Sequence, residues 1–262
     1  MVFLIEASSD SSSEENIDVS ELNATQEKVP QVFETSAPEL IRRSAFRGRY
    51  LKKLTDQKVW VPKAQRTPDH QTVVIFDWDD TLLCTSYLNS LDCGFVRDPA
   101  VQQDLKLIEE AAISLLESGL RLGHVFIITN AMKGWVESSA ARWMPGILPM
   151  LRQVPVISAR SSHEAQYPGE VGQWKKQAFL NLQRQLHADV ITNLISVGDS
   201  NFELEAVHAM GKAFATSLVK TIKLKENPTA QELAKQLALI KPKLEKIVEA
   251  ARNMKIQLER KN

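Results

Sequence analysis

Cysteine and histidine are scarce in this chain. Its 262 residues include two cysteines, Cys84 and Cys93, and five histidines, with no CxxC pair and no cluster of the two types. A disulfide framework or a structural zinc site is therefore not expected. No apolar run approaches the ~20 residues that span a bilayer, and the first residues lack the basic start of a signal peptide. We expect a soluble protein of a reducing compartment, the cytoplasm or alternatively the nucleus.

The chain also lacks a net charge. Lys and Arg together number 32, as do Asp and Glu, so no overall field favours a nucleic acid or an anionic membrane. The charges are nevertheless segregated, with nine acids and one lysine in residues 1–40 and nine bases and one aspartate in residues 41–66. Residues 1–40 are expected to form a disordered acidic tail. Residues 41–70 are expected to be either a solvated linker or a docking segment for an anionic partner.

Short apolar runs alternate with helical patterns after residue 71, which is typical of a parallel α/β sheet. Five strands are predicted, at residues 72–76, 124–129, 154–158, 194–198 and 212–218. Helices are predicted over residues 98–119, 134–143, 173–186 and 203–210. Residues 71–218 are therefore expected to form a Rossmann-like three-layer sandwich with a mainly parallel sheet. Residues 219–262 are expected to pack on it as an edge strand at 219–225 and helices divided by Pro242.

Two aspartates and a threonine directly follow the first predicted strand. The run VVIFDWDDTLL places Asp77, Asp79 and Thr81 there. The carboxyl ends of parallel strands face the crevice in which α/β proteins bind ligands. Acids buried near one another need a cation or a shared proton, and oxygen ligands without histidine favour Mg²⁺ over zinc. The run therefore predicts a divalent metal site.

Further polar side chains occur at the same predicted edge of the sheet. Thr129 ends the second strand and is followed by Asn130, while Asp199 follows the fourth strand. Glu203 lies four residues later on the next helix, and Lys175 is near the start of the helix before that strand. Carboxylates, a hydroxyl, an ammonium group and helix N-termini are typical of a site for a phosphoryl group and its metal.

The runs DWDDT, ITNA, QWKK and GDSNFE, in this order, resemble the four motifs of the haloacid dehalogenase superfamily. The similarity covers residues 72–218 and leaves both ends of the chain outside. Each motif alone is weak. Their order, with three of the four after apolar strand runs, makes the resemblance specific, and it implies a haloacid dehalogenase-like fold.

The resemblance implies a catalytic role for several of these residues. Asp77 would be the nucleophile that forms an aspartyl-phosphate, and Asp79 would protonate the leaving group and later activate water. Thr129 and the adjacent Asn130 would bind phosphoryl oxygens. Lys175 would neutralise charge on Asp77 and on the transferring group, with Lys176 as the alternative lysine.

The same resemblance implies a Mg²⁺ site. Asp199 would bind the ion together with Asp77 and the backbone carbonyl of Asp79. Glu203 would hold a metal-bound water or orient the ligands. Thr81 would brace the loop after the first strand rather than react.

Asp79 also distinguishes branches of the superfamily. An acid two residues after the nucleophile is typical of members that hydrolyse or transfer phosphate esters, whereas dehalogenases lack it. Asp80 stands where most relatives have glycine, and is either a solvated loop residue or a group that perturbs the metal site. The intervals between motifs leave room for a short flap at residues 82–97 and for little or no cap domain. Trp135 is expected to be a core or flap contact.

Without a cap, the site is expected to be open. Capless relatives often act on proteins or other large substrates, which close the pocket themselves. The expected activity is therefore a Mg²⁺-dependent phosphatase acting on a phosphoprotein or other large substrate, with no membrane or specific nucleic-acid partner. One alternative is a small-molecule phosphatase or phosphotransferase, lidded by the flap, by residues 160–170 or by a second subunit. The other is a binding or scaffold protein that has kept the fold without turnover.

Overall fold

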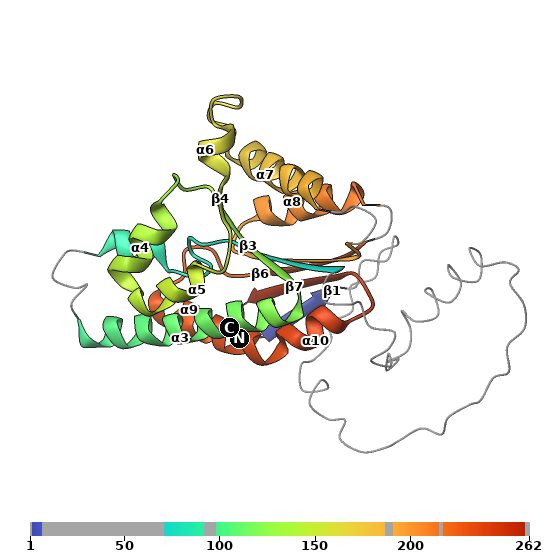
Figure 1. Ribbon diagram of the computed structural model, residues 1–262. Coiled ribbons are helices and arrows are strands. Elements are labelled where there is room, and N and C mark those ends of the chain that lie inside the picture. Colours follow the sequence, from blue (N-terminus) through green and yellow to red (C-terminus); the bar gives the residue numbers. More distant parts are fainter. Residues whose placement is uncertain (1, 7–70, 92–97, 187–190, 215–216, 260–262) are drawn as a thin grey trace, which may run out of the picture. The chain divides into compact units, whose positions relative to one another are not determined.

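Figure 1 shows the computed structural model of the protein, which describes residues 2–6, 71–91, 98–186, 191–214 and 217–259. All of these residues belong to one compact unit. The prediction of a disordered acidic tail over residues 1–40 is wrong for Val2–Glu6, which form a strand of the sheet. Residues 7–40 of that tail and the predicted basic segment 41–70 lie outside the described residues. None of the described helices combines the length and the apolar character needed to cross a membrane.

A seven-stranded sheet in the order β1-β7-β6-β5-β2-β3-β4 runs through the unit. Its strands are β1 (Val2–Glu6), β2 (Thr72–Phe76), β3 (His124–Thr129), β4 (Val156–Ser158), β5 (Asn193–Gly198), β6 (Leu218–Lys223) and β7 (Met254–Glu259). The six strands from β2 to β7 are parallel, and β1 pairs antiparallel with the outer edge of β7. The predicted α/β class with a mainly parallel, Rossmann-like sheet is therefore confirmed, but the prediction of five strands is wrong, because β1 and β7 extend the sheet to seven.

The order of the strands reverses at the centre of the sheet. From β2 the chain builds outward through β3 and β4, and it then returns to the other side of β2 and continues through β5, β6 and β7. The topological switch point thus lies between β2 and β5, where ligands bind in sheets of this kind. All residues of both strands are buried.

Helices cover both faces of the sheet, with α6, α7 and α8 on one side and α3, α9 and α10 on the other (Figure 1). The helices are α2 (Thr85–Ser90), α3 (Pro99–Leu122), α4 (Trp135–Trp143), α5 (Leu148–Leu151), α6 (Ala159–His163), α7 (Val171–Gln185), α8 (Asn201–Lys212), α9 (Ala230–Ile240) and α10 (Leu244–Glu249). Single 3₁₀ turns occupy Pro145–Ile147 and Lys241–Lys243. This arrangement forms the three expected layers.

Local sequence signals explain where several helices begin and end. Asp98 caps α3 through the N–H of Ala100 at 2.8 Å, with Pro99 in the first helical position. Thr229 and Glu232 form a capping box at the start of α9. Pro242 lies in the 3₁₀ turn between α9 and α10, so the predicted division of this helical stretch is confirmed.

Two strand predictions are wrong at the C-terminal end of the domain. The predicted strand at 212–218 begins on the last residue of α8, and the strand that pairs with β5 is β6, about six residues later. Nor is β6 an edge strand, because β7 pairs along its other side. The alternation of polar and apolar residues suggested a half-exposed strand. In fact Lys220 and Thr221 are buried with their apolar neighbours, and the Lys220 ammonium donates to the carbonyl of Val248.

Candidate active site

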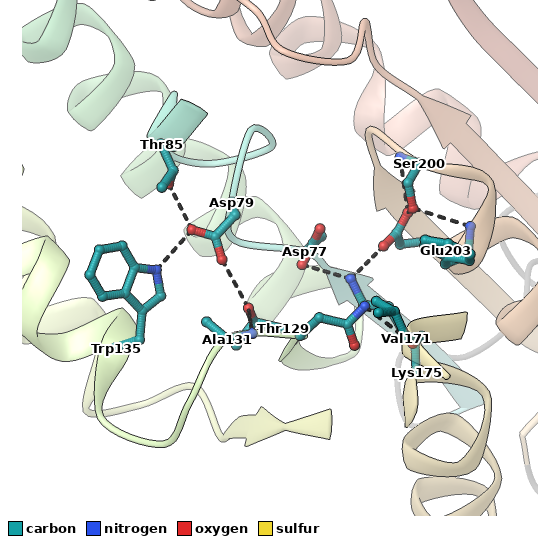
Figure 2. A network of polar contacts seen from close by, with 12 residues as sticks. Asp77, Asp79, Thr85, Thr129, Ala131, Trp135, Val171, Lys175, Ser200 and Glu203 are labelled. Atoms are coloured by element: carbon teal, nitrogen blue, oxygen red, sulfur yellow. Dashed lines mark hydrogen bonds and ion pairs between the residues drawn. The ribbon is translucent and has the colours of Figure 1, made fainter. Parts of the chain in front are cut away.

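Asp77 directly follows β2 at the switch point of the sheet. Its N–H donates to the carbonyl of Val197 in β5 at 2.9 Å, so the main chain still follows the sheet at this residue. The buried carboxylate forms an ion pair with Lys175, with 2.8 Å between Oδ1 and Nζ. Lys175 is buried on α7 and also pairs with Glu203 on α8 (Figure 2). Lys176, the alternative lysine, is exposed.

Burial is the largest influence on the pKa values of Asp77, Lys175 and Asp199. It raises the pKa of Asp77 well above the ordinary value, although Lys175 opposes the shift. Burial, assisted by the negative charge of Glu203, raises the pKa of Asp199 to about 7. Burial alone would lower the pKa of Lys175, but the attraction of Asp77 and Glu203 outweighs it and leaves that pKa raised. The site thus holds more negative charge than one ammonium group balances.

Three carboxylates of this group can hold a metal ion. Asp77, Asp199 and Glu203 each offer an oxygen, and these oxygens lie within 4.8 Å of one another. The donor set is entirely oxygen, which suits a hard divalent cation. Glu203 also has other partners, because one oxygen pairs with Lys175 and the other accepts from the N–H and hydroxyl of Ser200 in a capping box. Both oxygens of Glu203 are thus engaged, whereas Asp77 pairs with Lys175 through Oδ1, so Asp77 and Asp199 are the more available ligands for a metal ion.

Asp79 belongs to a separate hydrogen-bond network. Thr129 Oγ1 donates to Asp79 Oδ2 at 3.0 Å, while Trp135 Nε1 and Thr85 Oγ1 donate to Oδ1 at 2.8 and 2.7 Å. In Figure 2 the Asp79 carboxylate points toward Trp135 and Thr85, whereas Asp77 faces Lys175. The Asp79 side chain is not one of the three clustered carboxylates. A metal contact of Asp79 through its backbone carbonyl stays a prediction.

A tight turn and a left-handed glycine place the members of this network. After β2, the N–H groups of Leu82 and Leu83 both donate to the carbonyl of Trp78, which folds the chain back toward α2. After β3, Gly134 has a φ of 87°, a conformation that favours glycine, and it leads directly into α4. Trp135, the first residue of α4, is thereby presented to Asp79.

Asp80 is buried, so the interpretation as a solvated loop residue is wrong. Its backbone is left-handed, with a φ of 55°, where glycine is favoured. Its carboxylate accepts from the N–H of Ser86 at 3.0 Å, close to the start of α2. Burial raises the pKa of this carboxyl group. Because Asp80 accepts a hydrogen bond from an N–H group at the start of α2, it has a local structural role in stabilising that helix end.

The remaining predicted residues differ in their contacts. The hydroxyl of Thr129 accepts from the N–H of Ala131 at 3.0 Å and donates to Asp79, so its proton is directed at the carboxylate. Asn130 donates to the carbonyl of Val171 at 3.4 Å, and its side-chain oxygen has no hydrogen-bond partner in the described part of the chain. The buried hydroxyl of Thr81 likewise makes no hydrogen bond with any described residue. Main-chain bonds therefore brace the loop.

One cavity of about 400 Å³ joins the two networks. Six of the predicted residues line it, namely Asp77, Asp79, Asn130, Lys175, Asp199 and Glu203. Thr81 and Thr129 are not among its lining residues. The prediction that residues from distant motifs meet at one edge of the sheet agrees with this arrangement.

A scan against protein-family models gives no match to this chain, and a search of curated proteins gives none.

The cavity also contains residues that the sequence analysis did not place there, including Thr85, Trp135, Val171, Ser200 and Phe202. Ser200 follows Asp199 directly, so its position signalled a place near the site. Thr85 lies in the predicted flap, but a lone threonine carries no signal of its contact with Asp79. Trp135 resembles a core aromatic residue in the sequence, and nothing local reveals that its indole N–H faces a carboxylate.

The cavity combines a group of charged side chains around Asp77 with a second carboxylate, Asp79, that hydrogen bonds hold in position. A carboxylate paired with a lysine can attack an electrophile while the ammonium group balances negative charge on an incoming anion. A second carboxylate on the same loop, held by three donors, can exchange a proton with a leaving group or a water molecule. The clustered oxygens can hold a cation beside both.

Proposed function

We propose that this chain is a Mg²⁺-dependent phosphate monoester hydrolase of the haloacid dehalogenase type that acts through an aspartyl-phosphate on Asp77. One observation carries the proposal. Asp77 is ion-paired with the buried Lys175 beside Asp199 and Glu203, and Asp79 is held in its own network in the same cavity. A nucleophile, a charge-balancing lysine, a cation site and a general acid are thereby within reach of one bound phosphoryl group.

Asp77 carries out the covalent step. One of its carboxylate oxygens attacks phosphorus, the new bond between this oxygen and phosphorus forms, and the bond from phosphorus to the ester oxygen breaks. Lys175 holds the attacking carboxylate in place and balances charge on the phosphoryl oxygens. Asn130, whose side-chain oxygen has no described partner, lines the cavity and supplies an amide for contact with the substrate.

Asp79 handles the protons of both steps. It gives a proton to the departing ester oxygen, which leaves as an alcohol. It then takes a proton from a water molecule, whose oxygen attacks phosphorus and releases inorganic phosphate while Asp77 regains its carboxylate. Trp135 and Thr85 keep the Asp79 carboxylate directed into the cavity through these steps.

The residues present fit Mg²⁺. Asp77 and Asp199 would bind it directly, with Glu203 beside them, and the all-oxygen donor set and the raised pKa values of Asp77 and Asp199 indicate a need for positive charge at this point. When bound, the ion would neutralise negative charge on the phosphoryl group during transfer.

The lack of a cap domain among the described residues supports a large substrate. Between Thr81 and Thr129, the described residues form a short helix, the long helix α3 and strand β3, with no separate cap domain among them. We therefore propose a phosphorylated protein or another large molecule as substrate. A cytoplasmic location accords with the few cysteines of the chain.

Hydrolysis of nitrophenyl phosphate in the presence of Mg²⁺ tests the proposal. Wild type should release phosphate, a chelator should stop the reaction, and added Mg²⁺ should restore it. Asp77→Asn should abolish turnover. Asp104→Asn changes an aspartate on α3 that does not line the cavity, so it should leave the rate unchanged. Equal rates for wild type and Asp77→Asn would reject the hydrolase. Phosphate binding without turnover would favour the binding-protein alternative instead.

A further inference from the structure

Two of the exposed apolar side chains line the cavity, and a third belongs to the residue that follows a lining residue. Phe202 and Val171 line it and are 41% and 37% exposed, and Met132, 54% exposed, follows the lining residue Ala131. Leu107 on α3 is the other large apolar side chain with comparable exposure in the described part of the chain. Scattered exposed apolar residues need no explanation, but two of them lining one charged cavity do.

Local packing holds these apolar side chains in place. The ring of Phe202 lies so close to Gly172 that a Cβ at position 172 would be 2.9 Å from its Cδ1 atom. The carbonyl of Val171 accepts from Asn130 at 3.4 Å, which ties the start of α7 to the loop after β3. The hydroxyl of Ser161 contacts the sulfur of Met132 at 3.9 Å. Val171 and Phe202, in the first turns of α7 and α8, therefore form an apolar rim of the cavity, and Met132 lies in the loop after β3 next to the lining residue Ala131.

The charges inside the cavity restrict what the rim can accept. Five acids line the cavity, Asp77, Asp79, Asp80, Asp199 and Glu203, and Lys175 is the single cation among the described lining residues. Its ammonium group is already paired with Asp77 and Glu203. A substrate with a second anionic group would place that group near carboxylates with no free cation in the lining. An uncharged leaving group avoids this cost.

The rim also has an aromatic character. Phe202 and Trp135 both line the cavity, and Met132 adds a thioether sulfur, a group that makes favourable contacts with aromatic rings. In Figure 2, Trp135 lies on the Asp79 side of the site and Val171 on the Lys175 side. A flat ring attached to the phosphoryl oxygen would therefore meet apolar side chains among the lining residues.

We propose that the substrate is a phosphate monoester of an uncharged aromatic hydroxyl group, whose ring binds the apolar rim while the phosphoryl group binds Lys175 and the metal site. This inference rests on the proposed phosphatase function and adds the class of leaving group. A free aryl phosphate and a phosphotyrosine side chain share this chemistry.

Steady-state kinetics on two esters tests the rim. Phenyl phosphate and glycerol phosphate are compared, and each variant is expressed relative to wild type, so that the intrinsic reactivity of the esters cancels. Phe202→Ala should raise KM for phenyl phosphate about 3- to 10-fold, leave kcat nearly unchanged, and leave both constants for glycerol phosphate unaltered. Met132→Ala, next to the lining residue Ala131, should act in the same direction. Leu107→Ala is the matched control and should change neither ester.

Further substrates identify the source of the ring. A blocked peptide with phosphotyrosine that is used with a lower KM than phenyl phosphate would assign the ring to a protein, and the reverse order would assign it to a small molecule. Carboxyphenyl phosphate, which adds an anionic group, should have a higher KM than phenyl phosphate.

The outcomes separate the two proposals. If wild type with Mg²⁺ hydrolyses none of these esters, the phosphatase function fails. If it hydrolyses them but Phe202→Ala and Met132→Ala alter both esters equally or alter neither, the aromatic rim is rejected and the phosphatase stands. Preference for a phosphoserine peptide over the phosphotyrosine peptide would also overturn the inference. Thermal unfolding of each variant verifies that the fold is intact.

Discussion

The indole nitrogen of Trp135 donates a hydrogen bond to Oδ1 of Asp79 at 2.8 Å. Asp79 lies in the loop after β2, and Trp135 is the first residue of α4, after β3. Thr85 donates to the same oxygen at 2.7 Å, so two donors from different elements fix one carboxylate oxygen. The proposed general acid is therefore positioned by side chains that do no chemistry themselves.

Replacing Trp135 with phenylalanine should impair this positioning selectively. The variant keeps an aromatic ring but loses the N–H donor, so proton delivery to the leaving group should suffer. We expect turnover of an alkyl phosphate, whose leaving group needs a proton, to fall about 10- to 100-fold. Nitrophenyl phosphate, whose leaving group departs without help, should change much less in its first step, measured as the burst of nitrophenol.

The matched control is Trp143→Phe on the same helix. The Cζ atom of Arg142 lies 4.4 Å from the ring centroid of Trp143, and Trp143 does not line the active-site cavity. It should leave both rates unchanged. Equal slowing of both esters by Trp135→Phe would contradict a positioning role toward the leaving group.

Lys175 should be required for stability as well as for chemistry. It is buried between Asp77 and Glu203, so Lys175→Met leaves two buried carboxylates without their cation. We expect the free energy of unfolding, measured with a denaturant in the absence of divalent ions, to fall by about 3–5 kcal/mol. Lys176→Met, the exposed neighbour on the same helix, should have little effect. Similar stabilities of the two variants would contradict the buried ion-pair arrangement.

Many site residues could be predicted because local sequence and strand position suffice to place them. Asp77 and Asp199 directly follow buried strands, and parallel pairing brings the ends of β2 and β5 together. The resemblance placed Lys175 ahead of Lys176, and in the structure Lys175 is buried whereas Lys176 is exposed, because adjacent helical residues differ by about 100° in direction. Trp135 and Thr85 were missed because a hydrogen bond between distant segments leaves no periodic pattern.

The errors in the sheet also have physical causes. β6 was predicted as an edge strand because Lys220 and Thr221 are polar yet buried, which imitates the alternation of a half-exposed strand. β1 was not predicted, since Val2–Glu6 is short and pairs with residues 255–259 at the other end of the chain. Such a long-range pairing has no local signal.

Lys220 should make stability depend on pH. Burial lowers the pKa of this lysine from 10.5 to about 7. Between these values the unfolded chain carries a proton that the folded protein has released, so the free energy of unfolding rises with pH across this window, by roughly 5 kcal/mol in total. Below about pH 7 Lys220 is protonated in both the folded and the unfolded protein, so its contribution to the free energy of unfolding no longer changes with pH.

Lys220→Met should remove that dependence and stabilise the protein at neutral pH. The carbonyl of Val248 would keep a donor, because Asn193 also donates to it at 2.9 Å. Denaturant unfolding at pH 7 and pH 9.5 compares the variant with wild type and with Lys235→Met, an exposed control. Parallel pH profiles for wild type and Lys220→Met would show that Lys220 is not the group responsible.

The N-terminal strand should protect the edge of the sheet. β1 pairs with β7 from Val2 opposite Glu259 to Glu6 opposite Lys255. Deleting residues 1–6 would expose the hydrogen-bonding edge of β7, and uncovered edges promote self-association. We expect a lower thermal midpoint and concentration-dependent oligomers in sedimentation experiments. A deletion variant as monomeric and as stable as wild type would contradict a structural role for β1.

The phosphorylated form of Asp77 tests the central claim most directly. With nitrophenyl phosphate, Asp79→Asn should still allow attack by Asp77 but slow the attack of water by roughly 10²- to 10⁴-fold, so the phosphoenzyme should accumulate. Acid quenching after reaction with radiolabelled ester and Mg²⁺ should leave a hydroxylamine-sensitive label on the peptide that contains Asp77, absent from Asp77→Asn. Continued phosphate release by a protein that never carries label at Asp77 would contradict the account.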